Sequence, residues 1–144
     1  MTLRDVLLQN LVAVQERIAR ACDCVNRRPE AVTLVAVTKY AQLDWVRELI
    51  ELGQVELAES RPQQLAQRAV ELSPAVRWHL IGHLQRNKVE LVLPVAQRIH
   101  SVDSVRLLTA IDQQAQKLGR RPRLLLEVNV SGEDSKDGFH PDEL

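Results

Sequence analysis

The stretch "LVAVTKYAQLDWVRELIELG", residues 34–53, predicts how this chain folds. It begins within a run rich in Val and Thr (residues 32–38) that is too short for a helix. Its near-continuous apolarity is typical of a strand covered on both faces. The rest of the stretch repeats apolar residues at the spacing of one helix face, and Gly53 stands where a left-handed helix cap is expected. Together the two parts predict one βα unit.

The same alternation recurs along the chain. Further strands are predicted at residues 55–60, 76–82, 98–102 and 122–130. Further helices are predicted at residues 3–22, at 61–72 with Ser60 as N-cap, at 84–93, and from Asp103 or Ser104 to 118. Strands that start about every 21 to 25 residues indicate βα units. The pattern allows an open doubly wound sheet or a (β/α)₈ barrel, and in both the carboxyl ends of the strands form the active surface.

Composition limits the class of protein. The chain has 144 residues, of which 45% are hydrophobic and 26% charged, as expected for one globular domain. Lys plus Arg number 19 and balance 19 Asp plus Glu, which argues against nucleic acid or an anionic membrane as the main partner. No secretion signal or membrane-spanning stretch is visible, so a cytoplasmic protein is expected.

Lys39 is the residue that suggests chemistry. It follows the first predicted strand, so its amine is expected at the active end of the sheet. Desolvation by Val37 and Tyr40 would favour the neutral amine, which can form a Schiff base with an aldehyde. A solvated lysine in a turn would occupy the same position, and position alone leaves both interpretations open.

The histidines do not predict a metal site. His79 and His83 are four residues apart, which is the spacing of a helical metal-binding pair. They flank Gly82 at a strand end, however, and no third ligand lies near them in the sequence. Tyr40 and His79 are the nearby candidates for proton transfer to or from Lys39.

Several motifs resemble one known family. The segments "LVAVTKY", "AESRPQQL", "WHLIGHLQRNK", "HSVDS" and "VNVSGEDSKDGF" are similar, in order and spacing, to those of the pyridoxal-phosphate homeostasis proteins of the YggS/PROSC type. That family resembles the barrel domain of alanine racemase. The resemblance implies an α/β fold, a (β/α) barrel of the TIM type. Here it would be truncated to about five βα units after an extra N-terminal helix, as one incomplete domain over residues 1–144.

The resemblance also implies a function. It indicates a non-catalytic carrier of pyridoxal 5′-phosphate (PLP) that holds the cofactor as a Schiff base on Lys39 and passes it to PLP-dependent apoenzymes. Ser60, His79 and Asn129 would make further cofactor contacts. Two features depart from the family: Ala58-Glu59-Ser60 replaces its usual Gly-Glu-Asn, and no glycine cluster forms a phosphate cradle.

Two other functions remain open from the residues. The chain could be a PLP-dependent or Schiff-base enzyme, such as a racemase, decarboxylase or aldolase that uses the same lysine. It could also be an inert, truncated remnant. An incomplete barrel would leave apolar strand edges at residues 32–38 and 124–130, which predicts self-association.

Overall fold

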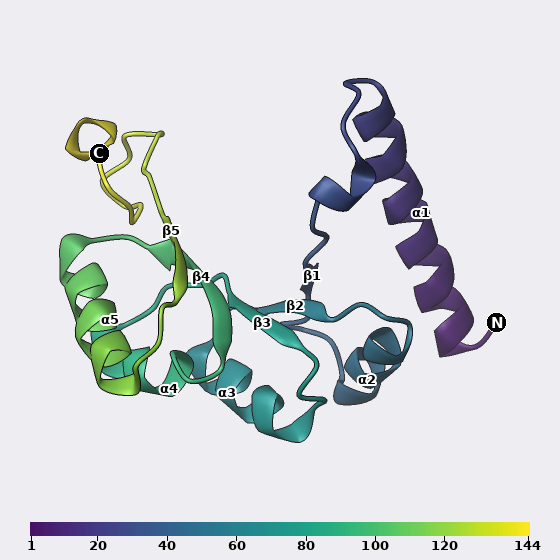
Figure 1. Cartoon of the computed structure of the whole chain (residues 1–144), viewed down its shortest axis with the longest axis horizontal. Helices are drawn as coiled ribbons and strands as arrows, with labels where there is room; N and C mark the ends of the chain where they lie inside the picture. Colours follow the sequence, from purple (N-terminus) through teal and green to yellow (C-terminus); the bar gives the residue numbers. More distant parts are fainter.

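The computed structural model describes the backbone of residues 1–144 and every side chain except that of Glu143. Strands and helices alternate along the chain after a long first helix (Figure 1). The helices are α1 (Leu3–Asp23), α2 (Leu43–Glu51), α3 (Pro62–Glu71), α4 (Val89–Val92) and α5 (Val105–Leu118). The strands are β1 (Ala36–Val37), β2 (Glu56–Glu59), β3 (Arg77–Leu80), β4 (Ala96–Val102) and β5 (Arg123–Leu126). Short 3₁₀ turns are η1 (Pro29–Ala31), η2 (Arg86–Lys88) and η3 (Pro141–Glu143).

The strands form one parallel sheet in the order β1-β2-β3-β4-β5. A strand order that follows the chain without reversal is the order of a barrel, whereas a doubly wound sheet reverses at a switch point. The helices α2 to α5 lie along one face of the sheet, and the other face is open between α1 and the C-terminal segment (Figure 1). The predicted α/β fold with an added N-terminal helix is confirmed.

The core lies between the sheet and the helices α2 to α5. Leu57, Leu80 and Ile99 point from neighbouring strands into this layer, where Leu65 and Ile111 from the helices are also buried. On the opposite, open face of the sheet, the strand registers place one residue from each strand side by side. These residues are Val37, Ala58, His79, Arg98 and Arg123. The covered face of the sheet is therefore mostly apolar, whereas the open face carries His79, Arg98 and Arg123 on β3 to β5.

Four local predictions differ from the structure, and one of them is the last strand, which ends at Leu126 and not at residue 130. The first strand is two residues long, because an edge strand pairs on one side only and its ladder with β2 is short. Arg61, and not Ser60, is the N-cap of α3, since Pro62 supplies the first helical residue and β2 extends to Glu59. Residues 84–93 are a 3₁₀ turn followed by the single-turn helix α4, not one continuous helix.

The predicted ends of α5 are confirmed. The hydroxyl of Ser104 accepts a hydrogen bond from the backbone N–H of Leu107, which satisfies one donor of the first turn. Gly119 ends the helix with φ of 60°, a left-handed conformation that costs glycine little because it lacks a Cβ.

Helix α1 stands beside the open face of the sheet. Thr2 and Asp5 form a capping box at its start, and the helix packs mainly against α2 and η1. Leu8, Val12 and Val14 remain exposed along it. None of the helices in the described chain is long and apolar enough to cross a bilayer.

Candidate functional site

Lys39 lies in the turn directly after β1, at the carboxyl end of the sheet. Its side chain is half-buried, and the Nζ atom lies 5.1 Å from the centre of the Tyr40 ring. Tyr40 is itself 86% exposed, so the ring beside this amine is largely in contact with solvent. Alternation along the strand places Lys39 on the same face as Val37, which is the open face of the sheet.

A buried ion pair holds the turn that carries Lys39. Glu59 Oε1 lies 2.6 Å from both the Arg68 guanidinium and the Thr38 hydroxyl, which donate to it. The same guanidinium donates to the backbone carbonyls of Thr38 and Ala41, at 2.9 and 2.6 Å. Arg68 therefore fixes the backbone on both sides of Lys39, although it belongs to α3. Sequence reasoning missed this role, because nothing in the local pattern of α3 indicates that its arginine faces inward.

Ser60 lies at the same end of the sheet, immediately after β2. It lines a cavity of about 290 Å³ together with His83 and Lys88. The carbonyl of Ser60 lies so close to Gly82 that a Cβ on Gly82 would approach its oxygen to 2.2 Å. The turns after β2 and β3 therefore touch through their backbones, and a glycine is required at the contact.

His79 is buried, and both of its ring nitrogens are engaged. The Nε2 atom lies 2.8 Å from Glu56 Oε2, and the Nδ1 atom lies 2.7 Å from His100 Nε2. Because a carboxylate only accepts hydrogen bonds, Nε2 of His79 donates to Glu56. In this structure neither ring nitrogen is available to a ligand. His79 also lies apart from His83, which is half-exposed in the turn after β3.

The pKa values along this chain of polar groups are shifted. Burial acts to raise the pKa of Glu56, but hydrogen bonds and charge from His79 and Arg77 outweigh it and lower the pKa below its ordinary 4.5. The pKa of His100 is lowered from 6.5, first by burial and then by the electrostatic effects of His79 and Arg98. Because both pKa values are lowered in the folded state, each shift makes folding less favourable as the pH falls. The effect of His100 begins as the pH falls below about 6.5, and that of Glu56 as it falls below about 4.5.

Asn129 organises the loop that follows β5. Its side-chain amide donates to the carbonyl of Glu133, at 2.9 Å. Its side-chain oxygen accepts from the Ser131 hydroxyl and from the backbone N–H of Gly132. The polar atoms of Asn129 are thus hydrogen-bonded within the loop. In this structure the side chains of Asn129 and His79 both already have partners within the protein.

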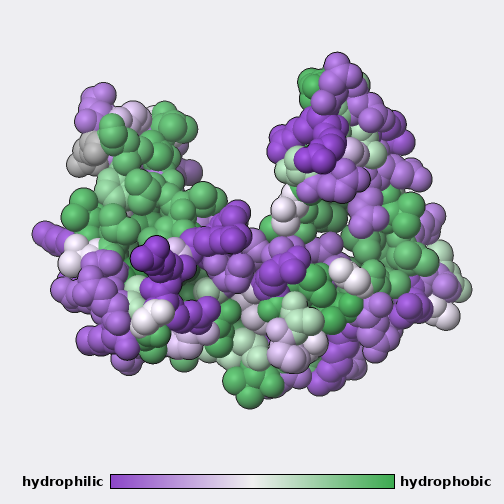
Figure 2. Space-filling view, in the orientation of Figure 1, coloured by the Kyte–Doolittle hydropathy of each residue, from purple (hydrophilic) through white to green (hydrophobic). Residues whose placement is uncertain are grey.

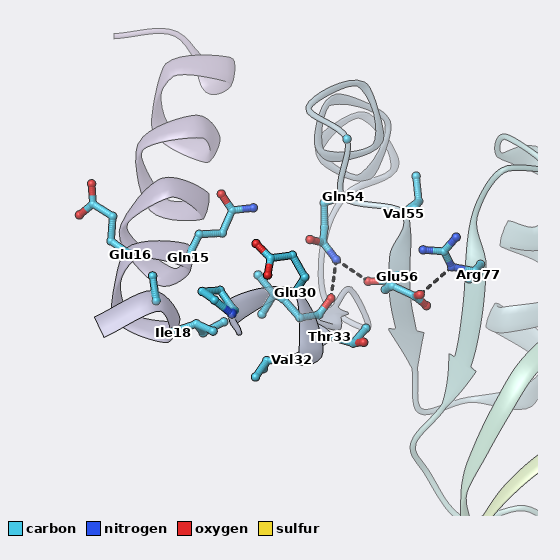
Figure 3. Close-up of a pocket in the computed structure, with 14 residues that line it drawn as sticks. Gln15, Glu16, Ile18, Glu30, Val32, Thr33, Gln54, Val55, Glu56 and Arg77 are labelled. Atoms are coloured by element: carbon cyan, nitrogen blue, oxygen red, sulfur yellow. Dashed lines mark hydrogen bonds and ion pairs between the residues drawn. The ribbon is translucent and has the colours of Figure 1, made fainter. Parts of the chain in front are cut away.

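A cavity of about 640 Å³ lies at the opposite end of the sheet, beside α1 (Figure 3). Glu56 and Arg77, the first residues of β2 and β3, form one wall, and Gln15 and Ile18 of α1 form another. Gln54 bridges the backbone between them by donating to the carbonyls of residues 34 and 56. Lys39 does not line this cavity or the one beside Ser60.

The amino-acid sequence is similar to those of known proteins along nearly the whole chain. No protein-family model matches the chain. It is 36% identical over 147 residues to the human pyridoxal phosphate homeostasis protein, covering 92% of this chain and 52% of the relative. It is 33% identical over 137 residues to the protein of that name from Aquifex aeolicus, covering 94% and 60%. The chain is a homologue of the pyridoxal phosphate homeostasis proteins. It spans between about half and three fifths of the length of these curated relatives.

Solved structures support the same relationship. A protein from Bifidobacterium adolescentis superposes with a TM-score of 0.88 at 33% identity, covering 98% of this chain and 62% of that one. PipY of Synechococcus elongatus with PLP bound gives a TM-score of 0.74 at 34% identity, covering 88% and 59%. The parallel βα units described here therefore correspond to part of a larger barrel-like structure.

Proposed function

We propose that this chain binds PLP reversibly, that Lys39 supplies the amine, and that the chain catalyses no reaction of its own. The observation that supports this most is the position of Lys39 at the carboxyl end of β1 in a homologue of the pyridoxal phosphate homeostasis proteins. The PLP-bound state of PipY supports the cofactor assignment.

The residues present fit the aldehyde end of the cofactor better than its phosphate end. Lys39 is half-buried on a turn that the Glu59–Arg68 pair holds in place, and Ser60 lies at the same end of the sheet. In the described chain no glycine-rich run of backbone amides lies at the start of α2, α3 or α5, where a phosphate would be held. We therefore expect weak binding, because a phosphate normally forms several hydrogen bonds worth about 1.5 to 3 kcal/mol each.

When bound, PLP supplies an aldehyde that condenses with an amine and releases water. In the proposed function Lys39 would hold the cofactor by its aldehyde carbon, and an amine of an acceptor protein would later take the place of the lysine. This is how PLP-dependent apoenzymes in the cytoplasm would receive the cofactor. We assign no proton-transfer step, because Tyr40 is largely exposed and the nitrogens of His79 are engaged with Glu56 and His100.

The test is a PLP titration of the untagged chain followed by absorption spectroscopy. We expect a saturable band in the visible region that Lys39→Ala removes. Lys88→Ala is the matched control, because Lys88 also lies at the carboxyl end of the sheet. We expect this variant to keep the band unchanged.

Borohydride reduction followed by peptide mapping identifies the modified lysine directly. Modification of Lys39 in preference to Lys88 and Lys136 supports the proposal. A band that survives in Lys39→Ala, or label spread evenly over the lysines, contradicts it. Turnover of an amino acid that depends on Lys39 would instead favour the enzyme hypothesis.

A further inference from the structure

Three side chains converge beyond the carboxyl ends of β3, β4 and β5. The Nδ1 atom of His83 lies 3.0 Å from Asp103 Oδ2 and 3.5 Å from Asp137 Oδ2. One possible ligand atom from each of the three residues lies within 4.8 Å of the other two. Each residue comes from a different strand-end loop, so this grouping is a product of the tertiary fold.

Asp103 provides a second, independent observation. Its side chain is 10% exposed, and its Oδ1 atom accepts a hydrogen bond from the Ser104 hydroxyl. Its Oδ2 atom is buried and has no hydrogen-bond partner in the described chain, despite its closeness to His83. A carboxylate oxygen withdrawn from water without a hydrogen bond is destabilising, and a cation beside it would offset this cost.

The backbone around the three side chains is held by specific contacts. The Ser101 hydroxyl donates to the Gly82 carbonyl at 2.6 Å, which joins the ends of β3 and β4 next to His83 and Asp103. Gly138 packs so closely on the backbone of Asn129 that a Cβ would lie 2.9 Å from its nitrogen. Together with the bonds of the Asn129 side chain, this contact folds the loop of residues 131–138 back toward the strand ends.

We propose that His83, Asp103 and Asp137 bind a divalent transition-metal ion such as Zn²⁺. Nitrogen and oxygen ligands lie about 2.0 to 2.2 Å from Zn²⁺, which places neighbouring ligand atoms about 3 to 3.5 Å apart. The distances from His83 Nδ1 match this range. An imidazole nitrogen favours Zn²⁺ or Co²⁺ over Mg²⁺ and Ca²⁺, which prefer oxygen ligands alone. The bound ion would pin the loop of residues 131–138 to the ends of β3 and β4.

The test uses Co²⁺ as a spectroscopic probe with the untagged chain and no PLP. We expect a visible absorption band that saturates at one equivalent and is displaced by Zn²⁺ but not by Mg²⁺ or Ca²⁺. Asp137→Asn removes a ligand from an exposed position and should weaken binding at least about tenfold. Asp134→Asn is the matched control, because it removes the same charge from the same loop and should leave affinity within about twofold.

His83→Gln provides a second ligand variant that removes the nitrogen. Saturating Zn²⁺ should raise the Tm of the wild type and of Asp134→Asn, and leave that of His83→Gln unchanged. If a protonated His83 merely forms ion pairs with the two carboxylates, Co²⁺ gives no saturable band and the proposal is overturned. Equal affinity in the Asp134 and Asp137 variants also overturns it. Neither readout depends on Lys39 or PLP, so failure here is distinguishable from failure of the proposed carrier function.

Discussion

At the scale of single residues, the pair of Glu59 and Arg68 is the feature that connects stability to the candidate site. The Glu59 side chain is fully buried and that of Arg68 is 9% exposed. Burying two charges is costly unless both are paired and hydrogen-bonded, and here the guanidinium also binds two backbone carbonyls. The geometry of the Lys39 turn therefore depends on Arg68, a side chain of α3.

Arg68→Met tests this dependence, since methionine retains apolar volume but removes the charge and the donors. We expect the free energy of unfolding to fall by about 3 to 5 kcal/mol, because Glu59 is left buried without a counter-charge. Urea denaturation at neutral pH measures the change. Arg47→Ala is the control, because its ion pair with Asp44 is exposed and such pairs are worth about 1 kcal/mol or less. Similar losses in the two variants would contradict the assigned role.

At the scale of secondary-structure elements, the ends of β2 and β3 are joined by backbone packing. Gly82 meets the carbonyl of Ser60 without space for a side chain. The Ser101 hydroxyl binds the Gly82 carbonyl from β4, so three neighbouring strands are aligned at one glycine. This alignment sets the spacing of the turns that carry Ser60 and His83.

Gly82→Ala should therefore separate the ends of β2 and β3. We expect a loss of about 1 to 3 kcal/mol from overpacking, because the clash involves backbone atoms that cannot rotate away. Thermal unfolding followed by circular dichroism measures it. Gly53→Ala serves as the comparison, since nothing lies within 4 Å of a Cβ there and only its φ of 90° opposes substitution. A Gly82 variant as stable as the wild type would show that the two turns are not in contact.

At the scale of the whole molecule, the sheet has an open inner face and two unpaired edges, β1 and β5. The space-filling view shows the hollow between α1 and the C-terminal segment, with apolar residues gathered over β5 (Figure 2). Leu125 and Leu126 are 45% and 43% exposed there. The returning chain covers part of this edge through a parallel bridge between Val128 and Phe139, which leaves the four residues of β5 itself unpaired on that side.

An open apolar edge predicts association between copies of the chain. We expect the average mass in sedimentation velocity to rise with protein concentration. Leu125→Lys should reduce this rise, because a lysine beside the edge opposes pairing with another strand. Val70→Lys adds the same charge on the exposed surface of α3 and should have no effect. A mass independent of concentration in the wild type would show that the edges do not drive association.

Much of the fold could be predicted from the sequence because its signals are local. The βα period, the cap at Ser104 and the glycine stop at Gly119 each depend on a few adjacent residues. The placement of Lys39 after a strand is equally local. The length of β1 was overestimated, because an apolar run does not reveal that the strand pairs on one side only.

The amino-acid sequence by itself determined the order of the elements and the end of the sheet at which Lys39 lies, since hydrophobic periodicity and turn residues act over short distances. The tertiary structure alone decided which polar groups meet. Arg68 reaches the Lys39 turn, His79 joins Glu56 to His100, and His83 faces Asp103 and Asp137. These partners lie between 20 residues apart in the chain, for His83 and Asp103, and 54 residues apart, for His83 and Asp137. Strand register and packing bring them together, and local patterns do not encode this.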